Sequence, residues 1–175
     1  IRKDALYCEP YDSLVRRSCL TVTNTVFECL TAWLAPILCF TMEEAWLSRY
    51  PSTDDSVHLQ QFPETPQGWR DDALAYEWAF LRNVRRVVTG ALEIARREKR
   101  IGASLEASPV VYIDIPEYLN ICVKHDLAEL FITSTALLRG YEAIPDSAFT
   151  LPDLTGIAVV VSTEAEGEKC RRCWR

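Results

Sequence analysis

The apolar positions between residues 12 and 37 recur at steps of three and four, which keeps them on one side of an α-helix. They are Val15, Cys19, Val22, Val26, Leu30, Trp33 and Ile37. We therefore predict a helix with a buried apolar stripe. Asp12 or Ser13 is placed to cap its first amides, and Pro36 is expected to end it or bend it.

A second, shorter helix is predicted directly after the first. Thr41 and Glu44 have the spacing of a capping box, and the dipeptide Tyr50-Pro51 closes the segment. Residues 51–70 are rich in Pro, Asp and Gln, which predicts a long connection. One short extended piece is expected in it, at residues 57–59.

The third predicted helix opens at Asp71 or Asp72 and ends at Gly102, where a left-handed cap favours glycine. Its apolar residues lie at positions 74, 81, 84, 88, 92 and 95, with 80, 87, 91 and 94 beside them. Such a set covers about half of the helix circumference. We therefore expect this helix to lie inside a bundle.

Beyond Gly102 the apolar period changes from 3.6 to 2, the period of β-strands. Strands are predicted at residues 110–115, 130–135 and 157–161, with a helix at 116–125 that starts at Pro116. The fold class is therefore mainly α: a helical bundle over residues 1–105 is followed by a small α+β subdomain over 106–166. Residues 167–175 begin a further module.

Composition limits the class of protein. With 49% hydrophobic and 25% charged residues in 175, the chain can bury a core. Its longest uncharged apolar run, residues 30–42, is shorter than the roughly 20 residues of a membrane span, and no signal peptide is evident. The seven cysteines do not resemble a secreted disulfide framework, which favours the cytoplasm. Because the chain begins at Ile1 and its one methionine is Met42, we expect a piece of a longer protein.

Basic residues share one side of the third predicted helix, although the net charge of −6 argues weakly against a nucleic-acid partner. The six arginines among them fall within an arc of about 120° and extend along about 27 Å. A guanidinium binds phosphate bidentately, so we predict an RNA contact surface there. The alternative is a solvated surface paired with acids such as Glu93 and Glu98. The candidate residues are Arg82, Arg85, Arg86, Arg96, Arg97, Lys99 and Arg100.

Tryptophans are candidates for stacking on RNA bases. Trp33, Trp46 and Trp78 lie on or near the apolar stripes of their helices, so we expect them in the core instead. Trp174 lies beside Arg171, Arg172 and Arg175, which makes it the one candidate for stacking.

Cys170 and Cys173 have the spacing of a zinc knuckle, in which both thiolates bind one metal ion. A structural zinc requires four ligands, and Cys122 lies on a predicted helix far upstream. We therefore predict half of a zinc site that continues in the parent protein. A redox-active pair is the weaker alternative, because no thioredoxin-like unit surrounds it. No glycine-rich phosphate loop, nucleophile elbow or paired carboxylates are present, so no catalytic residue is predicted.

Several segments resemble the anticodon-binding domain of the class I synthetases for isoleucine, valine and leucine. The segments are WLAPIL at 33–38, FTMEEAW at 40–46, SVHL at 56–59 and Phe62-Pro63. RREKRIGASLEA at 96–107 and the terminal GEKCRRCW resemble bacterial isoleucyl-tRNA synthetases in particular. A valine or leucine enzyme is not expected to carry the CRRC tail.

The resemblance implies a C-terminal piece of a cytoplasmic, monomeric enzyme that joins isoleucine to tRNA(Ile). ATP and Mg²⁺ would bind only to its catalytic domain, which lies upstream in that family, and zinc would bind in the parent protein. The piece itself is expected to bind tRNA, without catalysis and without a membrane. The alternative from a different class is a helical protein-interaction module with a metal-binding CxxC tail.

Overall fold

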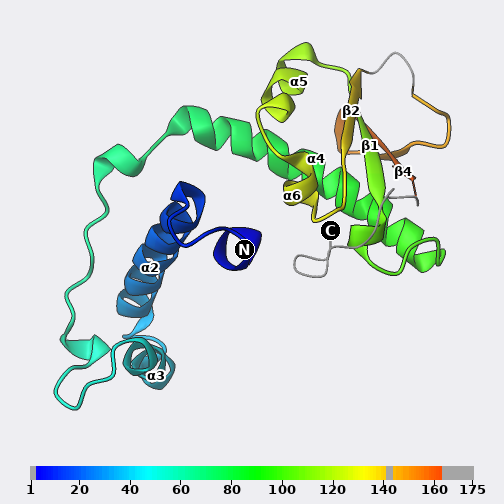
Figure 1. Ribbon diagram of the computed structural model, residues 1–175. Helices are drawn as coiled ribbons and strands as arrows, with labels where there is room; N and C mark the ends of the chain where they lie inside the picture. The colour runs from blue at the N-terminus through cyan, green and yellow to red at the C-terminus, as the bar shows by residue number, and fades with distance from the viewer. Residues whose placement is uncertain (1–2, 141–143, 163–175) are drawn as a thin grey trace. The chain divides into compact units, whose positions relative to one another are not determined.

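The computed structural model describes residues 3–140 and 144–162 of the chain. It divides into two compact units, residues 1–70 and residues 71–175, which we call the N-terminal unit and the C-terminal unit. Figure 1 shows the helices and strands of each unit. Among the described residues, no helix combines the length and the apolar composition that crossing a membrane requires.

The N-terminal unit is helical. Its elements are α1 (Lys3–Tyr7), α2 (Leu14–Leu34), α3 (Cys39–Arg49) and the short 3-10 helices η1 (Val57–Leu59) and η2 (Gln67–Trp69). The prediction of α2 is confirmed, with Ser13 at its N-cap and its end just before Pro36. The Ser13 hydroxyl donates to Glu9 Oε2 at 2.8 Å and makes no capping bond to the helix. The helix α1 is not predicted by the sequence pattern, because it is only five residues long.

The start of α3 differs from the prediction. The helix begins at Cys39 and its N-cap is Leu38, so the expected capping box of Thr41 and Glu44 does not form. Glu43 is the acid that makes a structural contact, because its Oε2 accepts hydrogen bonds from Ser56 Oγ at 2.8 Å and from the Val57 amide at 2.9 Å. These bonds hold the 57–59 segment as a 3-10 helix, so its predicted extended conformation is wrong.

The core of the N-terminal unit is small. Among the described residues, its buried cluster contains Ala35, Trp46 and Val57, and partly buried neighbours surround them: Phe27, Met42, Leu47 and Tyr50. The predicted burial of the α2 stripe is wrong in this unit. Its members Val22, Val26, Leu30 and Trp33 are 62%, 48%, 47% and 40% exposed. The helical period correctly indicates that α2 has one apolar side, but no other described part of the N-terminal unit covers that side.

The C-terminal unit contains a long helix and a mixed sheet. Its elements are α4 (Asp72–Arg97), η3 (Ser104–Glu106), β1 (Ser108–Ile113), α5 (Pro116–Val123), α6 (Leu127–Phe131), β2 (Leu137–Gly140), β3 (Phe149–Leu151) and β4 (Leu154–Ser162). The strand order is β2-β1-β4-β3. β1 runs parallel to β2, and β4 runs antiparallel to both β1 and β3. Since parallel strands need a crossover, α5 and α6 connect β1 to β2.

The strands at 110–115 and 157–161 are confirmed within β1 and β4, as is the start of a helix at Pro116. The predicted strand at 130–135 is wrong, because α6 occupies its first residues. Asp126 Oδ1 accepts the Glu129 amide at 2.9 Å and so caps α6, and Ile132 has a left-handed φ of 60° that ends it. Short apolar segments such as 130–132 suit either a strand or a buried helix.

The apolar side of α4 packs against the sheet. Leu81, Val84 and Val88 are fully buried in one cluster with alternate strand residues, including Val111 and Val159. Within the C-terminal unit this side of α4 is covered by the sheet, whereas the sequence predicts a bundle of helices. For the same reason the two units divide between Arg70 and Asp71, whereas the sequence predicts a boundary near residue 105.

Candidate nucleic-acid interface

The two sides of α4 have opposite character. Asp71 Oδ1 accepts the Leu74 amide at 2.9 Å and starts the helix, as predicted. The buried side is anchored on the sheet, which holds the helix axis in one position. The other side carries five arginines, which we call the basic face: Arg82, Arg85, Arg86, Arg96 and Arg97.

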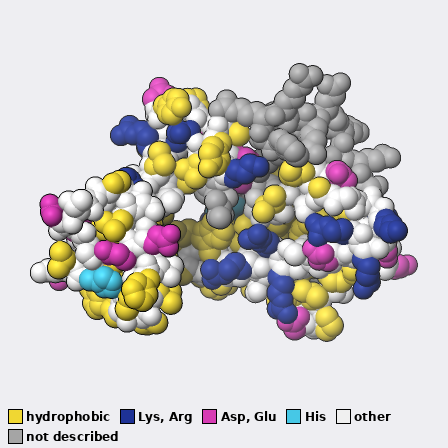
Figure 2. Space-filling model, turned by 90° about the horizontal axis from the view of Figure 1, so that it is seen from below, with side chains coloured by type: hydrophobic (Ala, Val, Ile, Leu, Met, Phe, Trp, Pro, Cys, Tyr) yellow, Lys and Arg dark blue, Asp and Glu magenta, His cyan; other side chains and the backbone are white. Residues whose placement is uncertain are grey.

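The basic face is long and open to solvent. At about 1.5 Å of rise per residue, its first and last members lie about 22 Å apart along the axis, within an arc of about 120°. Figure 2 shows basic side chains spread over the surface of the C-terminal unit, with acidic side chains between them. A guanidinium row of this length can contact several phosphates of an RNA strand.

Two members of the basic face are held by carboxylates. Arg86 Nη1 lies 2.8 Å from Asp153 Oδ2, and both side chains are more than half exposed. Arg96 pairs with Glu93 one turn earlier and also donates from Nη2 to Ser104 Oγ at 3.0 Å. The alternative of a carboxylate-paired surface therefore applies to part of the face. Exposed ion pairs of this kind contribute only about 0–1 kcal/mol to stability.

The other three members are available to a ligand. Arg82, Arg85 and Arg97 are exposed. Within residues 3–140 and 144–162, none of their guanidinium groups has an ion pair or a hydrogen bond. Each carries a full positive charge, because arginine does not lose its proton in proteins. The unpaired arginines lie near both ends of the face, so a polyanion that follows α4 meets both groups.

Lys99 and Arg100 lie beyond the helix, which corrects the prediction that α4 extends to Gly102. The left-handed residue is Lys99, with a φ of 59°. The Lys99 amide donates to the Arg96 carbonyl at 3.0 Å and the Arg100 amide to the Ala95 carbonyl at 2.9 Å, which is a Schellman cap. The Arg100 side chain pairs with Glu98 at 2.8 Å and approaches the Val161 carbonyl at 3.4 Å. Arg100 therefore lies with Lys99 just beyond the end of the basic face, and both stay predicted contacts of the tRNA.

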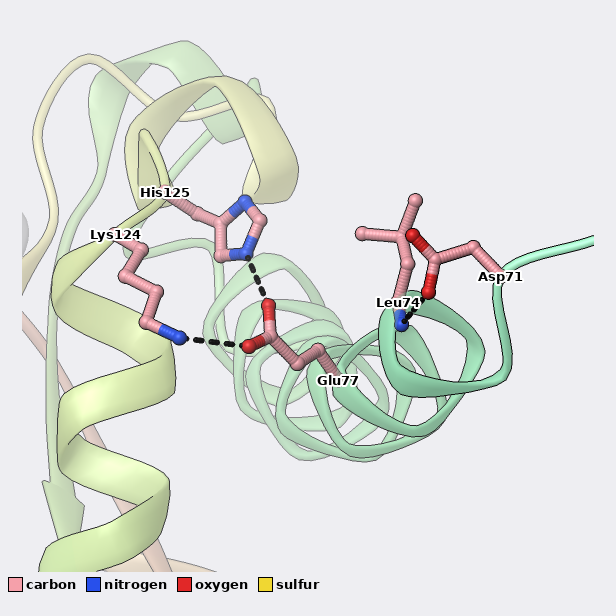
Figure 3. A network of polar contacts seen from close by, with 5 residues as sticks. All are labelled: Asp71, Leu74, Glu77, Lys124 and His125. Atoms are coloured by element: carbon pink, nitrogen blue, oxygen red, sulfur yellow. Dashed lines mark hydrogen bonds and ion pairs between the residues drawn. The ribbon is translucent and has the colours of Figure 1, made fainter. Parts of the chain in front are cut away.

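A polar cluster ties the start of α4 to the end of α5 (Figure 3). Lys124 Nζ lies 2.7 Å from Glu77 Oε1, and His125 Nε2 lies 3.7 Å from Glu77 Oε2. The hydrogen bond from Lys124 is the main reason why the pKa of Glu77 is lowered. Trp78 meets the His125 ring edge-on, with centroids 5.6 Å apart. No sequence pattern predicts this cluster, because its members lie far apart along the chain.

The tryptophans divide between buried and exposed positions. The prediction that Trp46 belongs to the core is confirmed, and its Nε1 donates to Asp55 Oδ2 at 3.2 Å. Trp33 and Trp78 are 40% and 39% exposed, so their predicted burial is wrong in the units as described. Trp174 lies outside the described residues.

The proposed zinc ligands Cys170 and Cys173 also lie outside the described residues. In the part of the chain that the structure describes, no three histidine, cysteine or acidic side chains gather as a metal site. Cys122 is fully buried, and burial raises the pKa of its thiol to about 11. A buried thiol of this kind resists forming the thiolate that binds metal. Cys122 is therefore a poor third ligand, as its position in the sequence predicts.

Comparison with known proteins adds an independent line of evidence. Residues 1–112 match the family described as the anticodon-binding domain of tRNA ligase. Over 175 residues the chain is 53% identical to the isoleucine–tRNA ligases of Agrobacterium fabrum and Brucella abortus. That of Mesorhizobium japonicum is 52% identical over 178 aligned positions. The whole chain is covered in each case, and it spans 18% of the length of these relatives.

Proposed function

Because the chain belongs to the family of anticodon-binding domains of tRNA ligases, we propose that it recognises tRNA(Ile) as part of an isoleucine–tRNA ligase. The parent enzyme would join isoleucine to this tRNA with ATP and Mg²⁺, which its catalytic domain would bind. The present chain would supply affinity and orientation for the tRNA and no catalytic group. We place the parent enzyme in the cytoplasm, as a monomer.

The observation that carries this proposal is the basic face of α4. Three arginines that have no partner among the described residues project from a helix whose opposite side is buried on a sheet, so the backbone that carries them is ordered before RNA binds. Phosphate contacts position a protein on nucleic acid and do not distinguish sequences. We therefore assign the basic face to the backbone of the anticodon stem, and we leave the anticodon bases to other residues.

Residues 167–175 would begin a zinc-binding module in the parent protein, with Cys170 and Cys173 as two of its four ligands. Trp174 would then lie next to the metal, where we propose that it stacks on an RNA base. Metal analysis of the present chain should give well under one zinc per chain. A longer chain that supplies a second cysteine pair should bind one zinc. Full, tight occupancy of the present chain would contradict the half-site.

The experiment is a titration of labelled tRNA(Ile) with the chain at several salt concentrations. Each arginine that neutralises a phosphate contributes about one unit to the slope of log affinity against log salt. The single variants Arg82→Ala, Arg85→Ala and Arg97→Ala should each weaken binding and reduce the slope by about one unit. The triple variant should reduce it by about three units.

Arg139→Ala is the matched control, because it removes the same charge from the same unit. Arg139 pairs in register with Tyr112, whose neighbours Val111 and Ile113 point to the α4 side of the sheet. Side chains alternate along a strand, so Arg139 lies on the face of the sheet away from α4. Its removal should leave the slope unchanged. Equal effects of Arg139→Ala and of the α4 variants would remove the basic face from the proposal.

A further inference from the structure

We propose that Asp153 competes with RNA for Arg86: the carboxylate holds the guanidinium in the free protein and yields it to a backbone phosphate in the complex. This inference rests on the proposed function, since it concerns how the same surface binds RNA. It assigns a role to an acidic residue that lowers the affinity of an otherwise basic surface. Asp153 would thereby set how tightly the chain binds RNA.

The geometry brings Asp153 to the basic face from a distant part of the sequence. Leu151 and Leu154 are paired in register, so Pro152 and Asp153 form the two-residue loop that joins β3 to β4. This hairpin is seated on α4, because a Cβ added at Gly90 would lie only 2.8 Å from the Phe149 ring. Glycine at position 90 thus allows β3 to approach the helix closely. The position of Asp153 beside Arg86 follows from this packing.

Arg86 is the paired arginine that is free to exchange its partner. Its side chain and that of Asp153 are 57% and 56% exposed, and the pair shares no further hydrogen bond among the described residues. Arg96, by contrast, is also bonded to Ser104, and its side chain is 39% exposed. On the helix wheel Arg86 lies inside the arc, between Arg82 and Arg97. A phosphate backbone that contacts both of these passes over Arg86.

The energetics favour exchange in the presence of a polyanion. An exposed ion pair shifts an equilibrium by about fivefold at most. A phosphate offers two oxygens to the planar guanidinium, and it is held near Arg86 by contacts on either side. A single small anion lacks those additional contacts. RNA therefore displaces the carboxylate from Arg86, and the competition lowers the affinity for RNA modestly.

The test is a double-mutant cycle in the full chain, with labelled tRNA(Ile) as the probe. Asp153→Asn should tighten binding about two- to fivefold, the range in which an exposed ion pair acts. Arg86→Ala should weaken binding and reduce the salt slope by about one unit, because Arg86 contacts a phosphate in the wild-type complex. In the Arg86→Ala background, Asp153→Asn should change affinity by less than about 1.5-fold, since its effect acts through Arg86.

Asp146→Asn controls for net charge. It removes one exposed carboxylate from the same unit, and among the described residues Asp146 has no arginine partner. It should leave affinity nearly unchanged. Thermal unfolding of every variant checks that the β3–β4 hairpin remains folded.

Several outcomes would overturn the inference. They are unchanged or weaker binding by Asp153→Asn, an equal gain in the Arg86→Ala background, and an equal gain from Asp146→Asn. Unchanged or weaker binding by Asp153→Asn would mean that Asp153 has only a structural role. An equal gain in either of the other two cases would mean that the carboxylate repels RNA without acting through Arg86. Failure of the proposed function is distinguishable, because the Arg82, Arg85 and Arg97 variants would then bind tRNA like the wild type.

Discussion

Among the residues that the structure describes, the buried core cluster of the N-terminal unit has three members, whereas the C-terminal unit buries one continuous cluster along α4, β1 and β4. Both units contain a long amphipathic helix. The apolar stripe of α4 is covered by a sheet, but Val22, Val26 and Leu30 of α2 remain about half exposed. Helical periodicity therefore identifies the side of a helix that can be buried. It does not identify the element that covers it.

The largest effect is expected where a unit depends on one side chain. Trp46 contacts Tyr50 and stacks on Phe27, with ring centroids 4.7 Å and 6.5 Å away. We expect Trp46→Ala to destabilise the N-terminal unit by about 3–5 kcal/mol. The C-terminal unit should remain folded. Amide NMR spectra, read separately for the two units, measure this effect.

Trp33→Ala is the control for Trp46, because it removes the same side chain at a 40% exposed position of the same unit. Trp33→Ala should lower the free energy of unfolding far less than Trp46→Ala does. If Trp46→Ala unfolds both units together, the two units fold as one cooperative block and do not differ in stability as the comparison assumes.

The second effect concerns the core of the C-terminal unit. Leu81 is fully buried, and Leu81→Ala should destabilise this unit by about 2–5 kcal/mol through lost burial and a cavity. Leu74→Ala on the same helix is the control, because Leu74 is 45% exposed and should cost less. Denaturant unfolding followed by circular dichroism measures both. Equal losses of stability in Leu81→Ala and Leu74→Ala would mean that another surface buries Leu74.

A smaller effect is expected at the start of α4. Asp71→Ala removes the side-chain cap on the Leu74 amide and should cost about 1 kcal/mol. Asp71→Asn keeps an accepting oxygen and should be nearly neutral. Thermal unfolding of the two variants measures the difference. An equal loss in both would indicate that charge at the helix start, and not the cap, stabilises this end.

The smallest effect concerns the pH dependence of the C-terminal unit. Lys124 lowers the pKa of Glu77 in the folded chain, so this contribution to stability is fully present above the unfolded pKa of about 4.3. It is lost as pH falls through the lower, folded pKa. Glu77→Gln should lack this step when the melting temperature is followed from about pH 7 to about pH 3. A profile identical to that of the wild type would show that the pair does not stabilise the unit.

Sequence signals that act over a few residues correctly predicted where several helices begin and end. The stop before Pro36, the cap at Asp71 and the helix start at Pro116 are correct, because each depends on neighbours within a few residues. The basic face was predicted for the same reason, since helical spacing alone places its arginines on one side. The motif resemblance also identified the family correctly.

The remaining features depend on contacts between distant residues. The 130–135 segment suits a strand or a helix by its own composition, and packing in the C-terminal core decides for α6. Nothing near Arg86 in the sequence indicates that Asp153 holds it, because the β3–β4 hairpin brings the two together. The sequence alone determined which surfaces of the helices are apolar and which are basic. Only the tertiary structure decided what covers them and which charges are paired, because burial and ion pairing join residues that are remote along the chain.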